Sequence, residues 1–325
     1  MTRMISRRTF LATGAAVAAL PFLPRPAAAA TPLAFQASWI NDAEFAGYYV
    51  ALDKGWYAEA GLDLTYLPGG PDVIPESAIA AGKADLTLTT PDTTVQAITD
   101  QGARFKIIGA QYQKNPLGVV SLAGKPIRTP QDLVGKTLAV PPVNTTSVEA
   151  MLALNGIDKA KVAIVPYQYD PTPLIKGEID ASVDFVTNVP YTIKTQGGQE
   201  AVSFLLYDVG FTIFNDTVVV TEDVLKTKRK ELVAFLGASR RGWVENLKDP
   251  AAYPPQFKDS HFKGTGRSID NEVFYNAAQK PLIETPKGIF SMSEEDIDKT
   301  IEALGRVGIK ARKDMFDTSL LAELG

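Results

Sequence analysis

The sequence predicts an α/β protein made of two lobes, each a mixed, mostly parallel sheet flanked by helices. Short apolar, β-branched segments alternate with helical ones through most of the chain, which is the pattern of repeated β-α units. The alternation starts a second cycle near Gly118, and longer polar helices follow Phe214. A chain of 325 residues is long enough to form two hydrophobic cores. We therefore expect two crossings between the lobes, with residues 1–30 set aside, lobe 1 formed by 31–117 plus 215–325, and lobe 2 formed by 118–214.

The first cycle is expected to open with a strand at residues 32–39 and an apolar helix at 44–61. The helix is indicated by aromatic and aliphatic residues at helical spacing, namely Phe45, Tyr48, Tyr49, Leu52 and Trp56. Gly61 suits its end. Because Tyr48 and Tyr49 are adjacent, only one of them is expected to face the core. The remaining elements expected before the first crossing are strands at 62–69, 84–90 and 105–112 and helices at 75–81 and 91–101.

The second cycle repeats the same alternation at shorter spacing. Polar residues that can cap a helix, Asn144 to Thr146, precede an apolar stretch that ends near Gly156. After the second crossing, a strand is followed by a long amphipathic helix with Leu232, Phe235 and Trp243 on one side. The other expected elements of this cycle are strands at 118–124, 136–140, 161–167, 179–188 and 202–210 and helices at 172–177 and 190–197.

The N-terminus carries the features of an export signal. Basic residues precede an apolar run from Phe10 to Leu23, and small residues at 27–30 suit cleavage before Thr31. The run is shorter than the roughly 20 residues that span a bilayer. Ser6 to Leu11, with the pair Arg7-Arg8, resembles the twin-arginine export consensus. We expect a periplasmic protein whose mature chain is not inserted in a membrane.

Composition removes several function classes. The chain has a formal net charge of -4, which gives no general attraction to nucleic acid or anionic lipid. It has no cysteine and one histidine, His261, which lies in a polar stretch and is expected to be an exposed loop residue. Thiol chemistry and disulfides are excluded, and histidine-dependent catalysis is disfavoured. Asp180 and Asp184, about 13 Å apart along one strand, are too widely spaced for a glycosidase pair. We expect no catalytic residues, no cofactor and no metal.

An ordered series of segments resembles the substrate-binding proteins of ABC importers, in the branch for thiamine precursors, sulfonates and nitrate. The opening match is Trp39 to Ala51 followed by Lys54-Gly55-Trp56-Tyr57 and Gly61-Leu62-Asp63. Further matches, in order, are residues 81–85, 133–136, 176–181, 185–190 and 220–225. The resemblance implies the two-lobed periplasmic-binding-protein (Venus flytrap) fold, which closes on a small solute and delivers it to a permease with a cytoplasmic ATPase. A monomer is expected, with no enzymatic activity.

The candidate ligand site follows from where ligands bind such sheets, which is outside the carboxyl ends of the strands. The predicted strand ends carry aromatic residues that can stack on a flat ring and amide, hydroxyl and carboxylate groups that can bond its nitrogens. They are poor in Lys and Arg, which favours a neutral or cationic heteroaromatic ligand, such as a pyrimidine thiamine precursor. The candidate residues are Trp39, Asn41, Glu44, Gly69, Asp72, Thr90, Asp92, Tyr112, Asn115, Asn144, Thr145, Tyr167, Tyr169, Asp184 and Asn188.

Alternatives remain open at this point. An anionic solute, such as an alkylsulfonate, nitrate or an aromatic carboxylate, could bind the helix start at Asn144 to Thr146. The same clamp could present its ligand to a receptor, as a sensor protein does. Trp39 could be a core-edge aromatic, and Asp92 could only favour the start of its helix. A fungal pyrimidine synthase of this fold uses a histidine and a cysteine-rich segment, and the lack of cysteine argues against that activity here.

Overall fold

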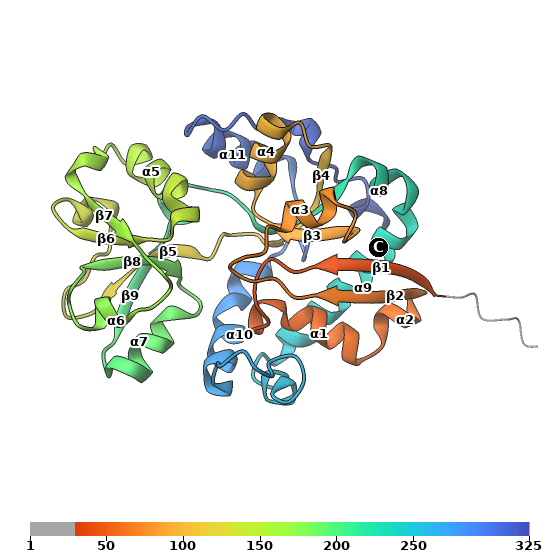
Figure 1. Ribbon diagram of the computed structural model, residues 1–325, viewed down its shortest axis with the longest axis horizontal. Helices are drawn as coiled ribbons and strands as arrows, with labels where there is room; N and C mark the ends of the chain where they lie inside the picture. Colours follow the sequence, from red (N-terminus) through yellow and green to blue (C-terminus); the bar gives the residue numbers. More distant parts are fainter. Residues whose placement is uncertain (1–29, 325) are drawn as a thin grey trace, which may run out of the picture.

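The structure, a computed structural model that describes residues 30–324, consists of two lobes, each built on a five-stranded sheet (Figure 1). The predicted signal peptide lies outside the described residues, apart from Ala30. The strand order is β2-β1-β3-β10-β4 in the first sheet and β7-β6-β8-β5-β9 in the second. Within residues 30–324, no helix is long and apolar enough to cross a bilayer.

The strands and helices alternate as the sequence predicts; β4 has the predicted bounds, and the other strands with predicted bounds are shorter than expected. The strands are β1 Thr31–Gln36, β2 Leu62–Leu67, β3 Leu86–Thr89, β4 Phe105–Tyr112, β5 Leu117–Leu122, β6 Thr137–Val140, β7 Ala163–Pro166, β8 Ala181–Phe185, β9 Ala201–Leu205 and β10 Asn215–Thr221. The helices are α1 Ala46–Asp53, α2 Trp56–Glu59, α3 Pro75–Ala80, α4 Pro91–Gln101, α5 Thr145–Leu154, α6 Thr172–Ile175, α7 Val189–Gly197, α8 Glu222–Thr227, α9 Arg229–Lys248, α10 Ile269–Ile283 and α11 Glu294–Gly305.

Each sheet is mostly parallel with a single reversed strand. In the first sheet β1 pairs in parallel with β2 and β3, and β10 pairs antiparallel with both β3 and β4. In the second sheet β6 pairs in parallel with β7 and β8, and β5 pairs antiparallel with both β8 and β9. The reversed strands β10 and β5 are the ones that follow a passage from one sheet to the other. This arrangement confirms the predicted α/β fold of two similar lobes.

Two helices predicted as continuous are each broken in two. The helix expected at 44–61 divides into α1 and α2 because Gly55 adopts a left-handed backbone conformation with φ of 70°. The long helix after β10 divides into α8 and α9 at Lys228. The apolar pattern continues through both breaks, so periodicity alone does not reveal them.

The core of lobe 1 is aromatic and covers both tyrosines of α1. Tyr48 stacks on Phe235 of α9 with ring centroids 6.1 Å apart, and Tyr49 stacks on His261 at 4.2 Å. Both tyrosines are fully buried, so the expectation that only one faces inward is wrong. The segment between α9 and α10 covers the second face of α1. His261, which also bonds Asp53 at 2.9 Å, is therefore a packed residue and not an exposed loop histidine.

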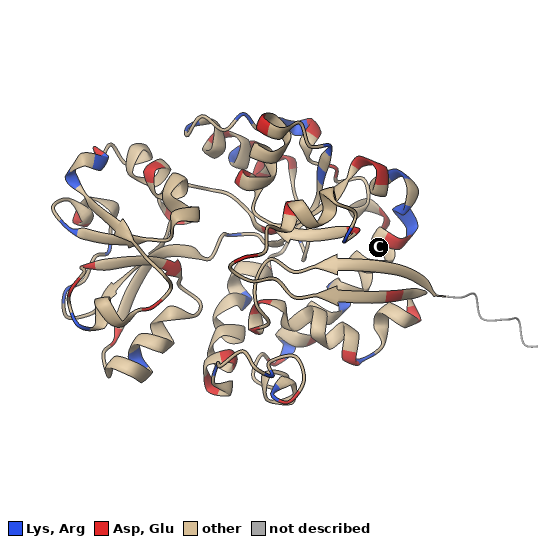
Figure 2. Cartoon of the chain, viewed as in Figure 1, with Lys and Arg blue, Asp and Glu red and all other residues tan. Residues whose placement is uncertain are grey.

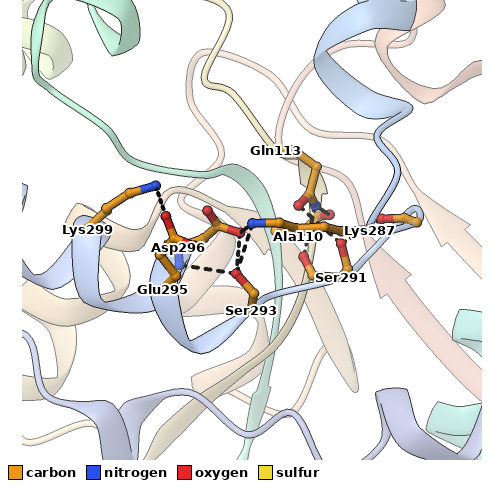
Figure 3. A network of polar contacts seen from close by, with 9 residues as sticks. Ala110, Gln113, Lys287, Ser291, Ser293, Glu295, Asp296 and Lys299 are labelled. Atoms are coloured by element: carbon orange, nitrogen blue, oxygen red, sulfur yellow. Dashed lines mark hydrogen bonds and ion pairs between the residues drawn. The ribbon is translucent and has the colours of Figure 1, made fainter.

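The end of β4, where the chain leaves lobe 1, is held by the segment between α10 and α11 (Figure 3). The Gln113 side-chain amide donates to the carbonyl oxygens of Ala110 and Ser291, both at 2.9 Å. Lys287 of this segment forms an ion pair of 2.6 Å with Asp296 in the first turn of α11. These contacts fix the position from which the chain starts its first crossing.

Helices α1 and α9 pack so closely that glycine is required at the contact. A Cβ atom at Gly242 would overlap the carbonyl oxygen of Gly47 and lie 2.9 Å from the Cβ of Ala51. At Gly237 of the same helix, the nearest atom to an added Cβ is 4.0 Å away. We expect Gly242→Ala to lower the free energy of unfolding by about 1–3 kcal/mol, because the helices must move apart.

Gly237→Ala is the matched control. We expect it to stabilise the protein slightly, since alanine is the better helix former by about 1 kcal/mol. Urea unfolding followed by circular dichroism measures both variants, and equal stability of the two would contradict the packing argument.

Candidate functional site

An aromatic group connects the lobes at the carboxyl ends of β1 and β7. The Trp39 ring, after β1, lies 5.4 Å from the Tyr169 ring, after β7. Tyr169 in turn lies 5.9 Å from Tyr167. Tyr169 has a left-handed backbone, with φ of 59°, and its side chain stays 43% exposed. A non-glycine residue held in this conformation is typical of a functional site.

Asp184 lies behind this aromatic group, at the end of β8. Its Oδ2 accepts a hydrogen bond from the Tyr167 hydroxyl at 3.1 Å, and its Oδ1 accepts one from the Phe185 backbone N–H at 2.7 Å. Burial raises the pKa of Asp184 to about 6, although the two hydrogen bonds and the charge of Arg267 act in the opposite direction. The carboxyl group is therefore poised to change its charge in the neutral range.

Arg267, just before α10, lies among buried acids. Its Nη2 is 3.2 Å from Asp42 Oδ2, and its Nε is 3.9 Å from Glu272 Oε1. Burial, followed by the charge of Asp42, raises the pKa of Glu272 to about 8. Two carboxyl groups thus face one guanidinium, and Asp42 is the nearer of the two. A pocket of about 320 Å³ opens beside Arg267, lined by Lys258, Phe262, Arg267, Ser268, Ile269 and Asp270.

Further contacts join the lobes beside Arg267. The Asn271 side-chain N–H of α10 donates to Asn188 Oδ1 at 2.9 Å. The rings of Tyr191 in α7 and Phe274 in α10 are 5.3 Å apart. Figure 1 shows α7 and α10 facing each other across the space between the lobes, and Figure 2 shows Lys and Arg scattered over both lobes with no concentration between them in this view.

Five of the predicted site residues therefore gather where the lobes meet, namely Trp39, Tyr167, Tyr169, Asp184 and Asn188. Asn41 lies near them and donates its side-chain N–H to the His261 carbonyl at 3.0 Å. Asn144 and Thr145 are half-buried at the start of α5, which has no side-chain cap.

The other candidates occupy structural positions. Asn115 accepts the Leu117 N–H at 2.9 Å as the chain enters β5, and Tyr112 is fully buried and donates to Gln279 at 2.6 Å. A Cβ at Gly69 would be 2.6 Å from the backbone of Ala37 and Trp39, so this glycine permits close packing. Of the rest, Asp72 is exposed, Thr90 and Asp92 lie at the start of α4, and Glu44 is buried beside Asp216. Ligand contacts by these residues stay predictions.

Sequence reasoning missed five charged or amide residues near these candidates, namely Asp42, Asp216, Arg267, Asn271 and Glu272. Asn271 and Glu272 are in the first turn of α10, where Ser268 accepts the Asn271 N–H at 3.2 Å. The sequence Ser268-Ile269-Asp270 is a capping signal that could have located this helix start. It gives no sign that the helix packs where the lobes meet.

The buried acids predict how stability depends on pH. Burial raises the pKa of Asp184 and Asp216 to about 6 and that of Glu272 to about 8. The folded chain therefore keeps protons that the unfolded chain releases near pH 4, and stability falls as the pH rises through 6 toward 8. We expect urea titrations to show a loss of at least about 1 kcal/mol between about pH 5 and pH 8.5.

Glu272→Gln, which can still accept the Ala43 N–H bond made by Glu272 Oε2, should flatten the upper part of this profile. A free energy of unfolding that increases with pH over the same range would contradict the assignment of protonated buried acids.

Comparison with known proteins places the chain in a family. Residues 42–253, more than half of the chain, match the family model described as NMT1/THI5 like. Residues 4–24 match the twin-arginine translocation pathway signal sequence, which confirms the predicted export to the periplasm. The chain is 26% identical over 218 residues to the riboflavin-binding protein RibY of Chloroflexus aurantiacus, covering 66% of this chain and 62% of the relative.

A formylaminopyrimidine-binding protein of Halalkalibacterium halodurans is also 26% identical over 218 residues, covering 65% of each chain. The matches thus span less than two thirds of these two relatives. A 4-amino-5-hydroxymethyl-2-methylpyrimidine phosphate synthase of Legionella pneumophila is 23% identical over 220 residues, covering 66% of this chain and 68% of the relative.

Among solved structures, the alkanesulfonate-binding protein SsuA of Xanthomonas axonopodis pv. citri matches with a TM-score of 0.65 and 13% identity, covering 90% of this chain and all of that chain. This likeness confirms the two-lobed fold. The resemblance drawn from the sequence motifs is confirmed as well, and the chain belongs to the NMT1/THI5-like family.

Proposed function

We propose that this protein is the extracytoplasmic solute-binding component of an ABC importer and that it closes on a small heteroaromatic ligand, such as a pyrimidine thiamine precursor. The observation that carries the proposal is the group of aromatic residues and buried acids where the lobes meet. Trp39 and Tyr169, one from each lobe, are 5.4 Å apart and can receive a flat ring as the lobes separate and close again.

The charges around this group favour a ligand that donates hydrogen bonds. Arg267 is already paired with Asp42 and lies near Glu272, so little positive charge is left for an anion. The Oδ1 atoms of Asn41 and Asn271 are buried and accept no hydrogen bond from any described residue. Ring N–H and amino groups would satisfy such acceptors, whereas a sulfonate brings only further acceptors.

The two passages between the sheets act as the hinge. The first runs from the end of β4 at Tyr112 to the start of β5 at Leu117, and the second from Leu205 to Asn215. These positions support the lobe boundaries 31–117 plus 215–325 and 118–214. Rigid sheets on both sides and short connections between them suit rotation of one lobe against the other.

No catalytic step is part of this proposal, although one relative is named as a synthase. His261 is the one histidine, and its ring is occupied by stacking on Tyr49 and by the bond to Asp53. We also propose that the protein acts as a monomer, with the ABC permease and its ATPase as partners.

The alternative is an anionic solute. The observation in its favour is the start of α5, where Asn144 and Thr145 lie beside backbone N–H groups without a side-chain cap. A protein that presents its ligand to a sensor would need the same site.

A thermal-shift screen tests the proposal. The panel comprises riboflavin, 4-amino-5-hydroxymethyl-2-methylpyrimidine, purines, aromatic carboxylates, alkylsulfonates and nitrate. We expect a pyrimidine or another heteroaromatic compound to raise the unfolding midpoint by mass action, with a larger shift at higher ligand concentration. A shift with sulfonates or nitrate alone would instead support the anionic alternative, and turnover of the bound compound would contradict a pure binding role.

Substitutions test the site itself. We expect Trp39→Ala and Asn188→Ala each to weaken binding of the compound found in the screen by at least about tenfold, or about 1.4 kcal/mol, with nearly unchanged unfolding midpoints of the free protein. Trp56→Ala is the matched control, because Trp56 lies in α2 with Arg241 stacked on its ring at 4.0 Å. Titration calorimetry measures all three, and wild-type affinity in both site variants would remove Trp39 and Asn188 from the site.

A further inference from the structure

Asp216 is a buried and conformationally unusual residue at the start of β10, directly after the second passage between the sheets. Its side chain is only 2% exposed, and its backbone φ is 44°, in the left-handed region. An aspartate can adopt this conformation but seldom does so inside a strand. A strained residue at the point where the chain re-enters lobe 1 calls for a physical explanation.

The side chain of Asp216 connects β10 to the loop that carries Trp39. Oδ1 accepts a hydrogen bond from the Ser38 hydroxyl at 2.8 Å, and Oδ2 accepts one from the Gln111 amide at 3.3 Å. Ser38 immediately precedes Trp39, whose ring contacts Tyr169 of the other lobe. The position of one cleft aromatic therefore depends on a bond to Asp216.

Asp216 also contacts a second buried carboxyl group. It is hydrogen-bonded to the Glu44 side chain, and Glu44 is 4% exposed and accepts from the Tyr275 hydroxyl at 3.0 Å. The cation in this region, Arg267, is paired with Asp42 instead. Two carboxylates in contact in a dry site cannot both be ionised, so at neutral pH the pair holds one proton, and Glu44 donates it to Asp216.

The ionisable groups around Glu44 and Asp216 do not take the shared proton away from this pair. They are Asp42 of the same loop, Tyr48 and Tyr49 of α1, Tyr66 of β2, Tyr112 of β4, Glu272 and Tyr275 of α10, and Arg267. Burial raises the pKa of every one of these phenols, which therefore stay neutral. The pKa values of Asp42 and Glu272 are raised as well, which burial causes first.

We propose that Asp216 is a proton-linked positioning residue. While it is ionised, Asp216 holds the Trp39 loop against β10 through Ser38, and when it takes up a proton it releases the loop. The ionised carboxylate makes charge-assisted bonds to Ser38 and Glu44, which are about twice as strong as bonds between neutral groups. Protonation replaces them with weaker neutral ones. The ligand affinity of the cleft then falls on acidification, an effect that rests on the function proposed above for the cleft.

The test uses the ligand-free protein, so its outcome does not depend on the identity of the ligand. Fluorine NMR of protein labelled with 5-fluorotryptophan gives a signal for each of the three tryptophans. Since burial raises the pKa of Asp216 to about 6, we expect the Trp39 resonance to move with a midpoint near that pH, while the Trp56 resonance does not move. Trp39→Phe assigns the signal.

Two variants each remove one partner of the hydrogen bond between Ser38 and Asp216. Asp216→Asn removes the titrating group, and Ser38→Ala removes the hydroxyl that joins it to the loop. Both should abolish the movement of the Trp39 resonance. If Asp216→Asn does not fold, Ser38→Ala, a small change at a half-buried position, decides the matter.

Asp184→Asn is the necessary control, because burial raises the pKa of Asp184 to about 6 as well and Asp184 lies near Tyr167 and Tyr169. The Trp39 titration should persist in this variant. A wild-type Trp39 resonance that does not titrate, a titration that survives Ser38→Ala, or one that disappears in Asp184→Asn would each overturn the proposal. A failed ligand screen would leave the titration unaffected, so the two proposals fail independently.

Discussion

The arrangement of this molecule depends on two sheets that direct the carboxyl ends of their parallel strands toward each other. The loops after β1 and β7 meet for this reason, and so do Trp39 and Tyr169. The strands that follow the two passages, β10 and β5, each lie between two neighbours in their sheet. Each of these two strands is therefore hydrogen-bonded to a neighbour on both sides, so the two passages that form the hinge lead into well-anchored strands.

Several acidic side chains are buried where the two lobes meet, and burial changes their pKa values. Asp42 and Glu44 come from the loop before α1, Asp184 from β8 and Glu272 from α10, and burial raises the pKa of every one of them. Arg267 lies close enough to compensate only some of this charge. A region in which acidic groups outnumber the cations that contact them is better suited to amino and ring N–H groups than to anions.

The sequence was sufficient to predict the fold and the positions of those candidate residues that are close to strand ends. Trp39, Tyr167, Tyr169 and Asp184 each follow or end a predicted strand, and the rule about carboxyl ends applies to them directly. Tyr112 also ends a strand, but its side chain points into the core, because the rule locates a strand end and not the face toward which its side chain turns.

Arg267 and Asn271 could not be found in this way, because their positions depend on how α10 packs against distant segments. Glu272, in the first turn of α10, bonds Ala43, which is 229 positions earlier, and Asn271 bonds Asn188, which is 83 positions earlier. The capping signal at Ser268 could have located the start of α10, but it carries no information about what the helix contacts. The breaks at Gly55 and Lys228 were not predicted either, because the apolar periodicity continues across both positions.

The left-handed backbone of Tyr169 has a consequence for how the cleft meets a guest molecule. A half-exposed aromatic side chain on a flexible loop would lose conformational entropy on capture of a ring, and this loss would subtract from affinity. In this protein the unfavourable φ of 59° is already imposed by the fold. The backbone that carries the ring is thus preorganised. The cost of its unfavourable conformation is part of the free energy of folding and does not reduce the free energy of binding.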